Sequence, residues 1–212
     1  SLQSSLTAQT EYKWIDKAIS FCGGREKLGK TAEAGKKNLD YFINDFWVYD
    51  NYKKVVGKKA KVITAIGMFY DMDDPNQFIR DAALALDDDG IFVAQLMCLK
   101  NMLDTNDVGN ICHEHLEFYS LSSLEFLLNR NGFELIDMEF NHVNGGSYRV
   151  YAGLKGGNPP HIEGAKERLA QFRAEGEGMD TKEAHRAFYE RIEENKKKCV
   201  DFIKEEVAKG KK

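Results

Sequence analysis

The stretch Lys61-Val62-Ile63-Thr64-Ala65-Ile66 decides the fold, because a short run of β-branched and apolar residues predicts a buried strand. Asp74-Pro75 follows it and predicts the start of a helix, with an acidic N-cap before a proline at the first helical position. The apolar positions of this helix continue to Leu86, and Asp87-Asp88-Asp89-Gly90 is expected to end it. Ile91–Met97 then predicts a second apolar strand. Strand, helix and strand in this order indicate a parallel crossover unit.

A further helix is predicted after this unit. Ser122 is the expected N-cap, with Glu125 completing a capping box and Leu121 packing on Phe126 as a hydrophobic staple. Asn131-Gly132 is expected to end the helix.

Two more strands, Phe133–Phe140 and Ser147–Leu154, are predicted to form an antiparallel hairpin through Asn144-Gly145-Gly146. The sequence therefore predicts an α/β fold with a mostly parallel, Rossmann-like sheet that closes in an antiparallel C-terminal hairpin. This is the order expected of a class I methyltransferase sheet, although the same order serves many other functions.

The chain is expected to divide into residues 1–154, an α/β domain, and residues 155–212, a charged helical extension. The extension contains two helical patterns, Ile162–Ala174 and Thr181–Ala208. Asp180 or Thr181 can cap the second helix.

Composition excludes several classes of protein. The 212 residues carry 30 Lys and Arg against 34 Asp and Glu, so a net charge of −4 argues against binding to nucleic acid. No apolar run is long enough to span a membrane and the first residues lack a secretion signal, so a cytoplasmic protein is expected. The four cysteines form no Cys-x-x-Cys pair, and no metal site is predicted.

The densest group of polar and titratable residues is Cys112-His113-Glu114-His115, within an otherwise apolar stretch. It follows the second strand of the crossover and is expected near the carboxyl edge of the sheet, where open α/β folds bind ligands. A neutral histidine there can accept a proton from a substrate, and a nearby carboxylate can orient its ring. Alternatives are a histidine pair with a structural role, a metal site, or Cys112 as a nucleophile.

A second candidate is Asn144-Gly145-Gly146-Ser147, where glycines permit close approach to a ligand and polar side chains can hydrogen-bond to it. A plain hairpin turn is the alternative. Gly67, directly after the first predicted strand, leaves room for a flat ligand.

These motifs together resemble the family of S-adenosylmethionine-dependent sugar C-methyltransferases. The resemblance covers about Asn38 to Lys212. It rests on Ile66–Pro75, Asp89–Val93, Ile111–Leu121 and Asn144–Val150.

The resemblance implies transfer of a methyl group to a carbon next to a keto group, usually on a nucleotide-linked deoxysugar. It implies that His115 is the base and that Glu114 is its polar partner. The substrate positions that it implies are Cys112, His113, Asn144, Gly145, Gly146 and Ser147. The positions implied to border S-adenosylmethionine are Asp45, Phe46, Gly67, Met68 and Phe69.

Members of that family also have an N-terminal zinc domain and a further C-terminal α/β domain, so this sequence is expected to be a central portion. Cys22-Gly23-Gly24 does not follow a recognisable apolar strand and is expected to end a helix, which leaves residues 22–37 without an evident cofactor loop. The alternative function is a non-catalytic methyltransferase-like module whose helical tail mediates assembly. A homo-oligomer is possible in either case.

Overall fold

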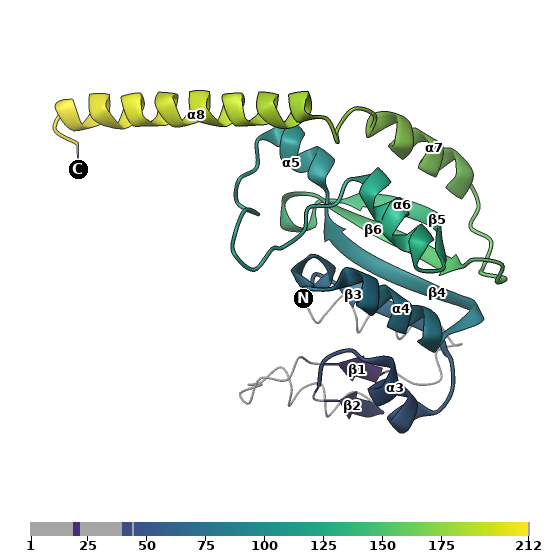
Figure 1. The fold of residues 1–212 in the computed structure, drawn as a ribbon. Helices are drawn as coiled ribbons and strands as arrows, with labels where there is room; N and C mark the ends of the chain where they lie inside the picture. The colour runs from purple at the N-terminus through teal and green to yellow at the C-terminus, as the bar shows by residue number, and fades with distance from the viewer. Residues whose placement is uncertain (1–18, 22–39, 44, 212) are drawn as a thin grey trace.

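The computed structural model describes residues 19–21, 40–43 and 45–211. Its main sheet has the strand order β3 (Ala60–Ile66), β4 (Leu86–Met97), β6 (Ser147–Leu154) and β5 (Phe133–Asn141). β3 and β4 are parallel, whereas β6 is antiparallel to both of its neighbours. β3, β4 and β5 therefore run in one direction with β6 reversed between the last two, which confirms the predicted mostly parallel sheet with an antiparallel hairpin (Figure 1).

A second, two-stranded parallel sheet pairs β1 (Ile19–Phe21) with β2 (Tyr41–Ile43). The prediction that no strand precedes Cys22-Gly23-Gly24 is therefore wrong, because β1 ends at Phe21. A strand of three residues is too short to show a periodic pattern, and its partner lies beyond residue 40. These glycines, with all of residues 22–37, lie outside the described residues.

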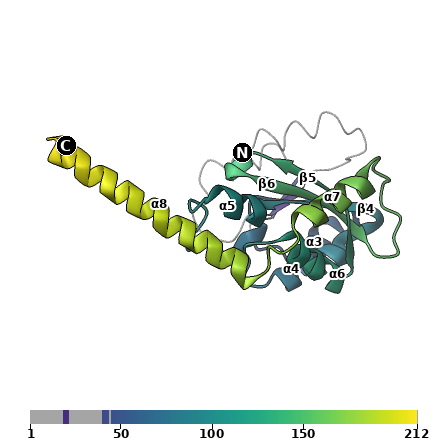
Figure 2. The same ribbon diagram turned by 90° about the horizontal axis from the view of Figure 1, so that it is seen from above.

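Helices cover one face of the main sheet in a continuous row, in which α3 contacts α4, α4 contacts α6 and α6 contacts α7 (Figures 1 and 2). A short helix follows β4, and a long one projects away from the sheet at the C-terminal end (Figure 2). The helical elements are α3 (Tyr49–Val56), η1 (Phe69–Asp71), α4 (Pro75–Ala85), α5 (Leu99–Thr105), α6 (Leu121–Arg130), η2 (Val143–Gly145), α7 (Ala165–Glu175) and α8 (Lys182–Ala208).

Aromatic rings fill the core between the sheet and this helical row. Phe69 stacks on Tyr119 with ring centroids 5.5 Å apart and meets Phe78 edge-on at 5.6 Å. Phe92 of β4 joins this group to Phe133 of β5, again with centroids 5.6 Å apart. Such ring pairs fix η1 and the start of α6 against the sheet, which in turn fixes the loops at its carboxyl edge.

Several local predictions are confirmed. The Asp74 carboxylate accepts a hydrogen bond from the backbone N–H of Gln77 and caps α4, with Pro75 at the first helical position. Thr181 caps α8 in the same way by accepting from the N–H of Ala184. Asn131 ends α6, and Gly132 adopts a φ of +87°.

The acidic run before the second strand was assigned wrongly. Asp87-Asp88-Asp89-Gly90 does not stop a helix but belongs to β4, which begins at Leu86. The pairing of β3 with β4 shifts register between Ala60 and Val62, which accommodates the acidic run. Lys61 of β3 forms ion pairs with Asp87 and Asp89. The neighbouring strand therefore supplies the counter-charge that this part of β4 needs.

The predicted start of α6 is also corrected. Ser120, and not Ser122, is the N-cap, and its hydroxyl accepts from the N–H of Ser123. Glu125 is not part of a capping box, because Arg173 of α7 donates to its carboxylate at 2.6 Å. The Phe126 side chain is exposed, so the staple with Leu121 is not formed.

The extension forms two helices close to the predicted ranges. α7 packs on β5, and Arg168 donates two hydrogen bonds to the buried Asp137 carboxylate, at 3.0 and 2.6 Å. α8 meets α5, where Arg191 donates to the carbonyl of Leu103. Among the described residues, no helix is long and apolar enough to cross a membrane.

Candidate active site

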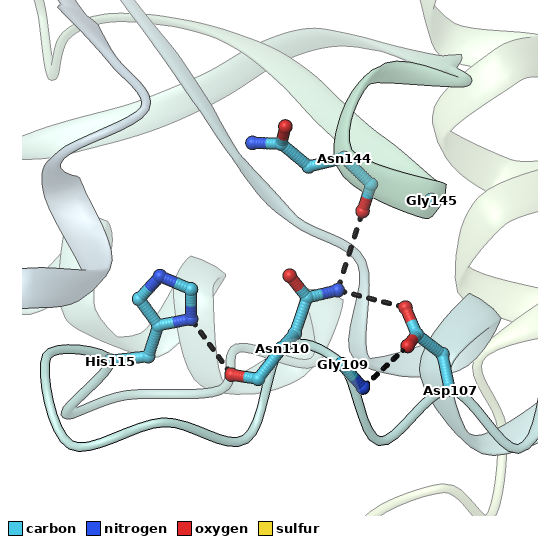
Figure 3. A pocket seen from close by; sticks show the side chains of 6 residues that line it. All are labelled: Asp107, Gly109, Asn110, His115, Asn144 and Gly145. Carbon is cyan, nitrogen blue, oxygen red and sulfur yellow. Dashed lines mark hydrogen bonds between the residues drawn. The ribbon is translucent and has the colours of Figure 1, made fainter.

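A pocket of about 460 Å³ lies at the carboxyl edge of the main sheet. Its walls come from the loop that follows α5 and from the turn between β5 and β6 (Figure 3). The residues that line it are Asp107, Gly109, Asn110, His115, Asn144 and Gly145. The structure thus brings His115 together with two residues of the predicted glycine turn.

The loop that carries His115 is tied to the start of η1. The backbone N–H groups of Leu116 and Glu117 both donate to the carbonyl of Tyr70, at 2.9 and 3.1 Å. Before them the chain makes a turn in which the N–H of His115 donates to the carbonyl of Cys112 at 3.2 Å. The Tyr70 ring meets the His115 imidazole edge-on, with centroids 4.8 Å apart. His115 is therefore held by backbone and ring contacts to the segment that follows β3.

Hydrogen bonding fixes which nitrogen of His115 carries the proton. Nδ1 lies 2.7 Å from the backbone carbonyl oxygen of Asn110. A carbonyl oxygen only accepts, so Nδ1–H is the donor and Nε2 of the neutral ring is unprotonated. Nε2 points away from this carbonyl, toward the side of the pocket on which Asn144 lies (Figure 3). His115 is therefore arranged to accept a proton at Nε2.

The Asp71 carboxylate interacts electrostatically with this histidine. Burial raises the pKa of Asp71 above its ordinary value and nearby Glu114 adds to the rise, whereas the attraction of His115 lowers it. Asp71 was not among the predicted residues, and it reaches the histidine only because the loop docks on Tyr70.

Glu114, predicted as the partner of His115, points elsewhere. Its carboxylate lies 3.3 Å from Nδ1 of His113, and the His113 side chain is 90% exposed. Its own backbone N–H and the Cys112 thiol, by hydrogen bonding, lower the pKa of Glu114. These three residues are exposed beside the pocket and do not line it. Asn110, and not Glu114, is the residue whose backbone carbonyl accepts a hydrogen bond from His115.

The glycine turn divides into pocket-lining and supporting residues. Asn144, with φ +51°, and Gly145, with φ +78°, line the pocket. Ser147 is only 2% exposed, and its hydroxyl donates to the carbonyl of Val143 at 2.7 Å. The prediction that Ser147 binds substrate is therefore corrected, since its hydroxyl supports the turn. Gly146 is buried and packs on Asn101 of α5.

The predicted cofactor positions are not equally available. Gly67 directly follows β3 with φ +66° and is exposed, with Oη of Tyr70 3.9 Å from its Cβ position, and Met68 is partly buried. Asp45 and Phe46 are both exposed shortly after β2. Phe69 is 0% exposed in the aromatic core, so the prediction that its side chain borders the cofactor is wrong. The other four positions are at least partly exposed.

Asp107, Gly109 and Asn110 are site residues that the sequence reasoning missed. The Asp107 carboxylate accepts from the N–H of Gly109 at 2.8 Å and from Nδ2 of Asn110 at 2.9 Å. An aspartate two residues before such an N–H is the signature of an Asx turn, which could have been read from the sequence. Its position in the pocket could not, because that depends on the turn between β5 and β6.

A family model described as a methyltransferase domain matches residues 11–138. The chain belongs to the methyltransferase-domain family. This membership confirms the expected kind of domain, a methyltransferase domain. Among curated relatives, the domain is 26% identical over 152 residues to C-methyltransferase NovU from Streptomyces niveus. The match covers 72% of this chain and 36% of NovU, so the chain spans about a third of the relative's length.

Solved structures share the fold of this methyltransferase domain. A Haloferax volcanii methyltransferase in complex with the Trm112 activator aligns with a TM-score of 0.55 at 11% identity, over 72% of this chain and 78% of that one. The O-methyltransferase NcsB1 from neocarzinostatin biosynthesis aligns with a TM-score of 0.50 at 15% identity. The alignment covers 72% of this chain and 45% of NcsB1. Both likenesses confirm the predicted class I methyltransferase fold.

Proposed function

We propose that this methyltransferase domain is a C-methyltransferase that acts on a nucleotide-linked keto-deoxysugar or a similar small molecule, with His115 as general base. The observation that carries the proposal is the hydrogen bond from Nδ1 of His115 to the Asn110 carbonyl, which leaves Nε2 unprotonated. The name of the relative NovU, a C-methyltransferase, supports carbon as the acceptor atom.

His115 would generate the nucleophile. Nε2 accepts the acidic proton from the carbon next to the keto group, and the electron pair stays on the substrate as an enolate. Bound S-adenosylmethionine supplies an electrophilic methyl group, so a carbon–carbon bond forms as the carbon–sulfur bond breaks. Asp71 stabilises the imidazolium left after proton transfer, because the two groups attract each other electrostatically.

Four residues would hold the cofactor. The Asp45 carboxylate suits the ribose hydroxyls, and the exposed Phe46 ring suits a flat base. Gly67 permits close approach of the backbone, and Met68 adds an adaptable apolar contact. On the substrate side, Asn144 and Gly145 line the pocket. Cys112 and His113 are exposed beside it, and Gly146 supports the turn from behind.

Two experiments test this proposal. Isothermal calorimetry with S-adenosylmethionine should give saturable binding, and no binding at millimolar cofactor would refute it for this chain. With labelled S-adenosylmethionine and a nucleotide-linked keto-deoxysugar, His115→Ala should lower turnover by about 10²–10⁴-fold while cofactor affinity stays near the parent value. His185→Ala is the matched control, because that side chain is exposed on α8 and does not line the pocket. Near-normal turnover in His115→Ala would remove His115 as the base.

The second candidate function is a non-catalytic module that assembles through its helical extension. α8 favours it, because none of its residues is buried and Phe202, Ile203 and Val207 are 63%, 52% and 62% exposed. Under this alternative, residues 1–154 form the methyltransferase-like unit, and residues 155–212 form the element through which the chain assembles as a homo-oligomer. Sedimentation that shows self-association, together with no cofactor binding, would favour this alternative.

A further inference from the structure

The segment of chain that faces His115 contains a small hydrogen-bonded cluster of Asp107, Gly109 and Asn110, which we call the clamp. Asp107 accepts through Oδ1 from the Gly109 N–H at 2.8 Å and through Oδ2 from Nδ2 of Asn110 at 2.9 Å (Figure 3). The same Asn110 amide lies 3.3 Å from the carbonyl oxygen of Asn144. The Asn110 side chain is therefore held from two sides, by a carboxylate and by the glycine turn.

The clamp determines where the Asn110 carbonyl lies. This carbonyl belongs to the residue whose side chain is clamped, and it accepts from Nδ1 of His115 at 2.7 Å. The tautomer of a neutral histidine is set by the partner of one ring nitrogen. A displaced carbonyl would leave Nδ1 without its acceptor, and the proton could then move to Nε2, where a base needs a lone pair.

We infer that Asp107 is a positioning residue for the base: through Asn110, it holds His115 in the tautomer with the proton on Nδ1. The consequence for turnover rests on the proposed function, whereas the tautomer itself does not. Asp107 need not touch the substrate to have this effect. Groups in a second layer that orient a histidine ring through its other nitrogen affect function in the same way in metal sites.

Other titratable groups near the ring cannot replace this contact. Tyr70 meets the imidazole with its ring edge, and Asp71 interacts with it electrostatically. Glu114 lies against His113 and receives a hydrogen bond from the Cys112 thiol. The Asn110 carbonyl is the group within hydrogen-bond distance of Nδ1.

Nitrogen NMR of protein labelled with ¹⁵N-histidine tests the inference directly, because the two ring nitrogens report their protonation separately. The His115 signals are assigned by their loss in His115→Ala. At a pH where the ring is neutral, Nδ1 should be the protonated nitrogen in the parent protein. Asp107→Asn should shift the balance toward the proton on Nε2. Asp104→Asn on α5, an exposed acid paired with Lys100, is the matched control and should change nothing.

Exchanging the two side chains separates the clamp from general damage. Asp107→Asn replaces one of the two carboxylate acceptors by an amide donor that faces the Asn110 amide. Asn110→Asp places two carboxylates against each other. Each single variant should therefore lower turnover at least about tenfold, with little change in KM for the cofactor. The double exchange restores one donor facing one acceptor between positions 107 and 110, but not the longer contact with the Asn144 carbonyl, and should therefore recover part of the Nδ1 tautomer and part of the turnover.

An unchanged tautomer in Asp107→Asn, or no recovery in the double exchange, would overturn the inference even if the cofactor binds. Absence of cofactor binding with the expected tautomer shifts would instead refute the proposed function and leave the clamp in place.

Discussion

Gly146→Ala should destabilise the protein through a contact behind the pocket. Gly146 has a φ of +136°, and a Cβ there would lie 2.5 Å from Nδ2 and 2.7 Å from Cγ of Asn101. Asn101 cannot turn away freely, since its Nδ2 donates to the carbonyl of Gly145 and its backbone belongs to α5. The new methyl group must therefore displace Asn101 or the turn.

The expected magnitude has two parts. Forcing a residue with a Cβ into positive φ costs about 1–2 kcal/mol. Losing the Asn101–Gly145 hydrogen bond adds about 1 kcal/mol. A total of about 2–3 kcal/mol corresponds, for a chain of this size, to a Tm lower by about 4–12 °C. Because Gly145 lines the pocket, ligand affinity should fall as well.

Gly156→Ala is the matched control for the backbone part. Gly156 has a φ of +74°, but nothing lies within 4 Å of its Cβ position. Urea unfolding should show that Gly146→Ala loses at least about 1 kcal/mol more than this control. Asn101→Ala should relieve the collision, so the double variant should lose less stability than the two single losses combined. Equal losses in Gly146→Ala and Gly156→Ala, or strict additivity in the double variant, would refute the reasoning.

Two further predictions concern a helix cap and a partly buried acid. Thr181→Ala should speed amide hydrogen exchange in the first turn of α8, because the lost cap is worth about 1 kcal/mol. Thr181→Ser keeps a hydroxyl and should keep the exchange rates of the parent protein. Equal rates in the two variants would contradict the role of Thr181 as a cap. Burial raises the pKa of Glu117 above its ordinary 4.5, so its carboxyl group binds a proton more tightly in the folded state than in the unfolded state. The unfolding free energy therefore falls as pH rises through the pKa of the folded state. Glu117→Gln should therefore raise the unfolding free energy at neutral pH, and this gain should disappear below pH 4.5. A gain that persists in acid would show that it has another cause.

Much of the fold could be predicted from the sequence because its signals are local. The Asp74 and Thr181 caps are bonds to an N–H three residues away, and Asn131-Gly132 ends α6 through its own backbone preferences. The strands of the hairpin were predicted for the same reason, since β5 and β6 are neighbours in both sequence and space. Where several similar signals compete, as among Ser120, Ser122 and Ser123, the choice was wrong.

The sequence also identified His115 and the Asn144-Gly145 turn as candidates, because these residue types are rare and chemically specific. Their meeting in one pocket depends on β6 inserting between β4 and β5, which no local pattern encodes. The same is true of Phe69, whose neighbours in the core come from α4, β4 and the start of α6.

The sequence by itself determined the α/β class, most element boundaries and the presence of a candidate base. Only the tertiary structure decided that Asn110 rather than Glu114 orients His115, that Asp71 lies near it and that Ser147 supports the turn. The physical reason is the range of the interactions. Caps and turns form within a few residues of the chain, whereas the protonation and orientation of His115 depend on groups brought together by the docking of separate loops at one edge of the sheet.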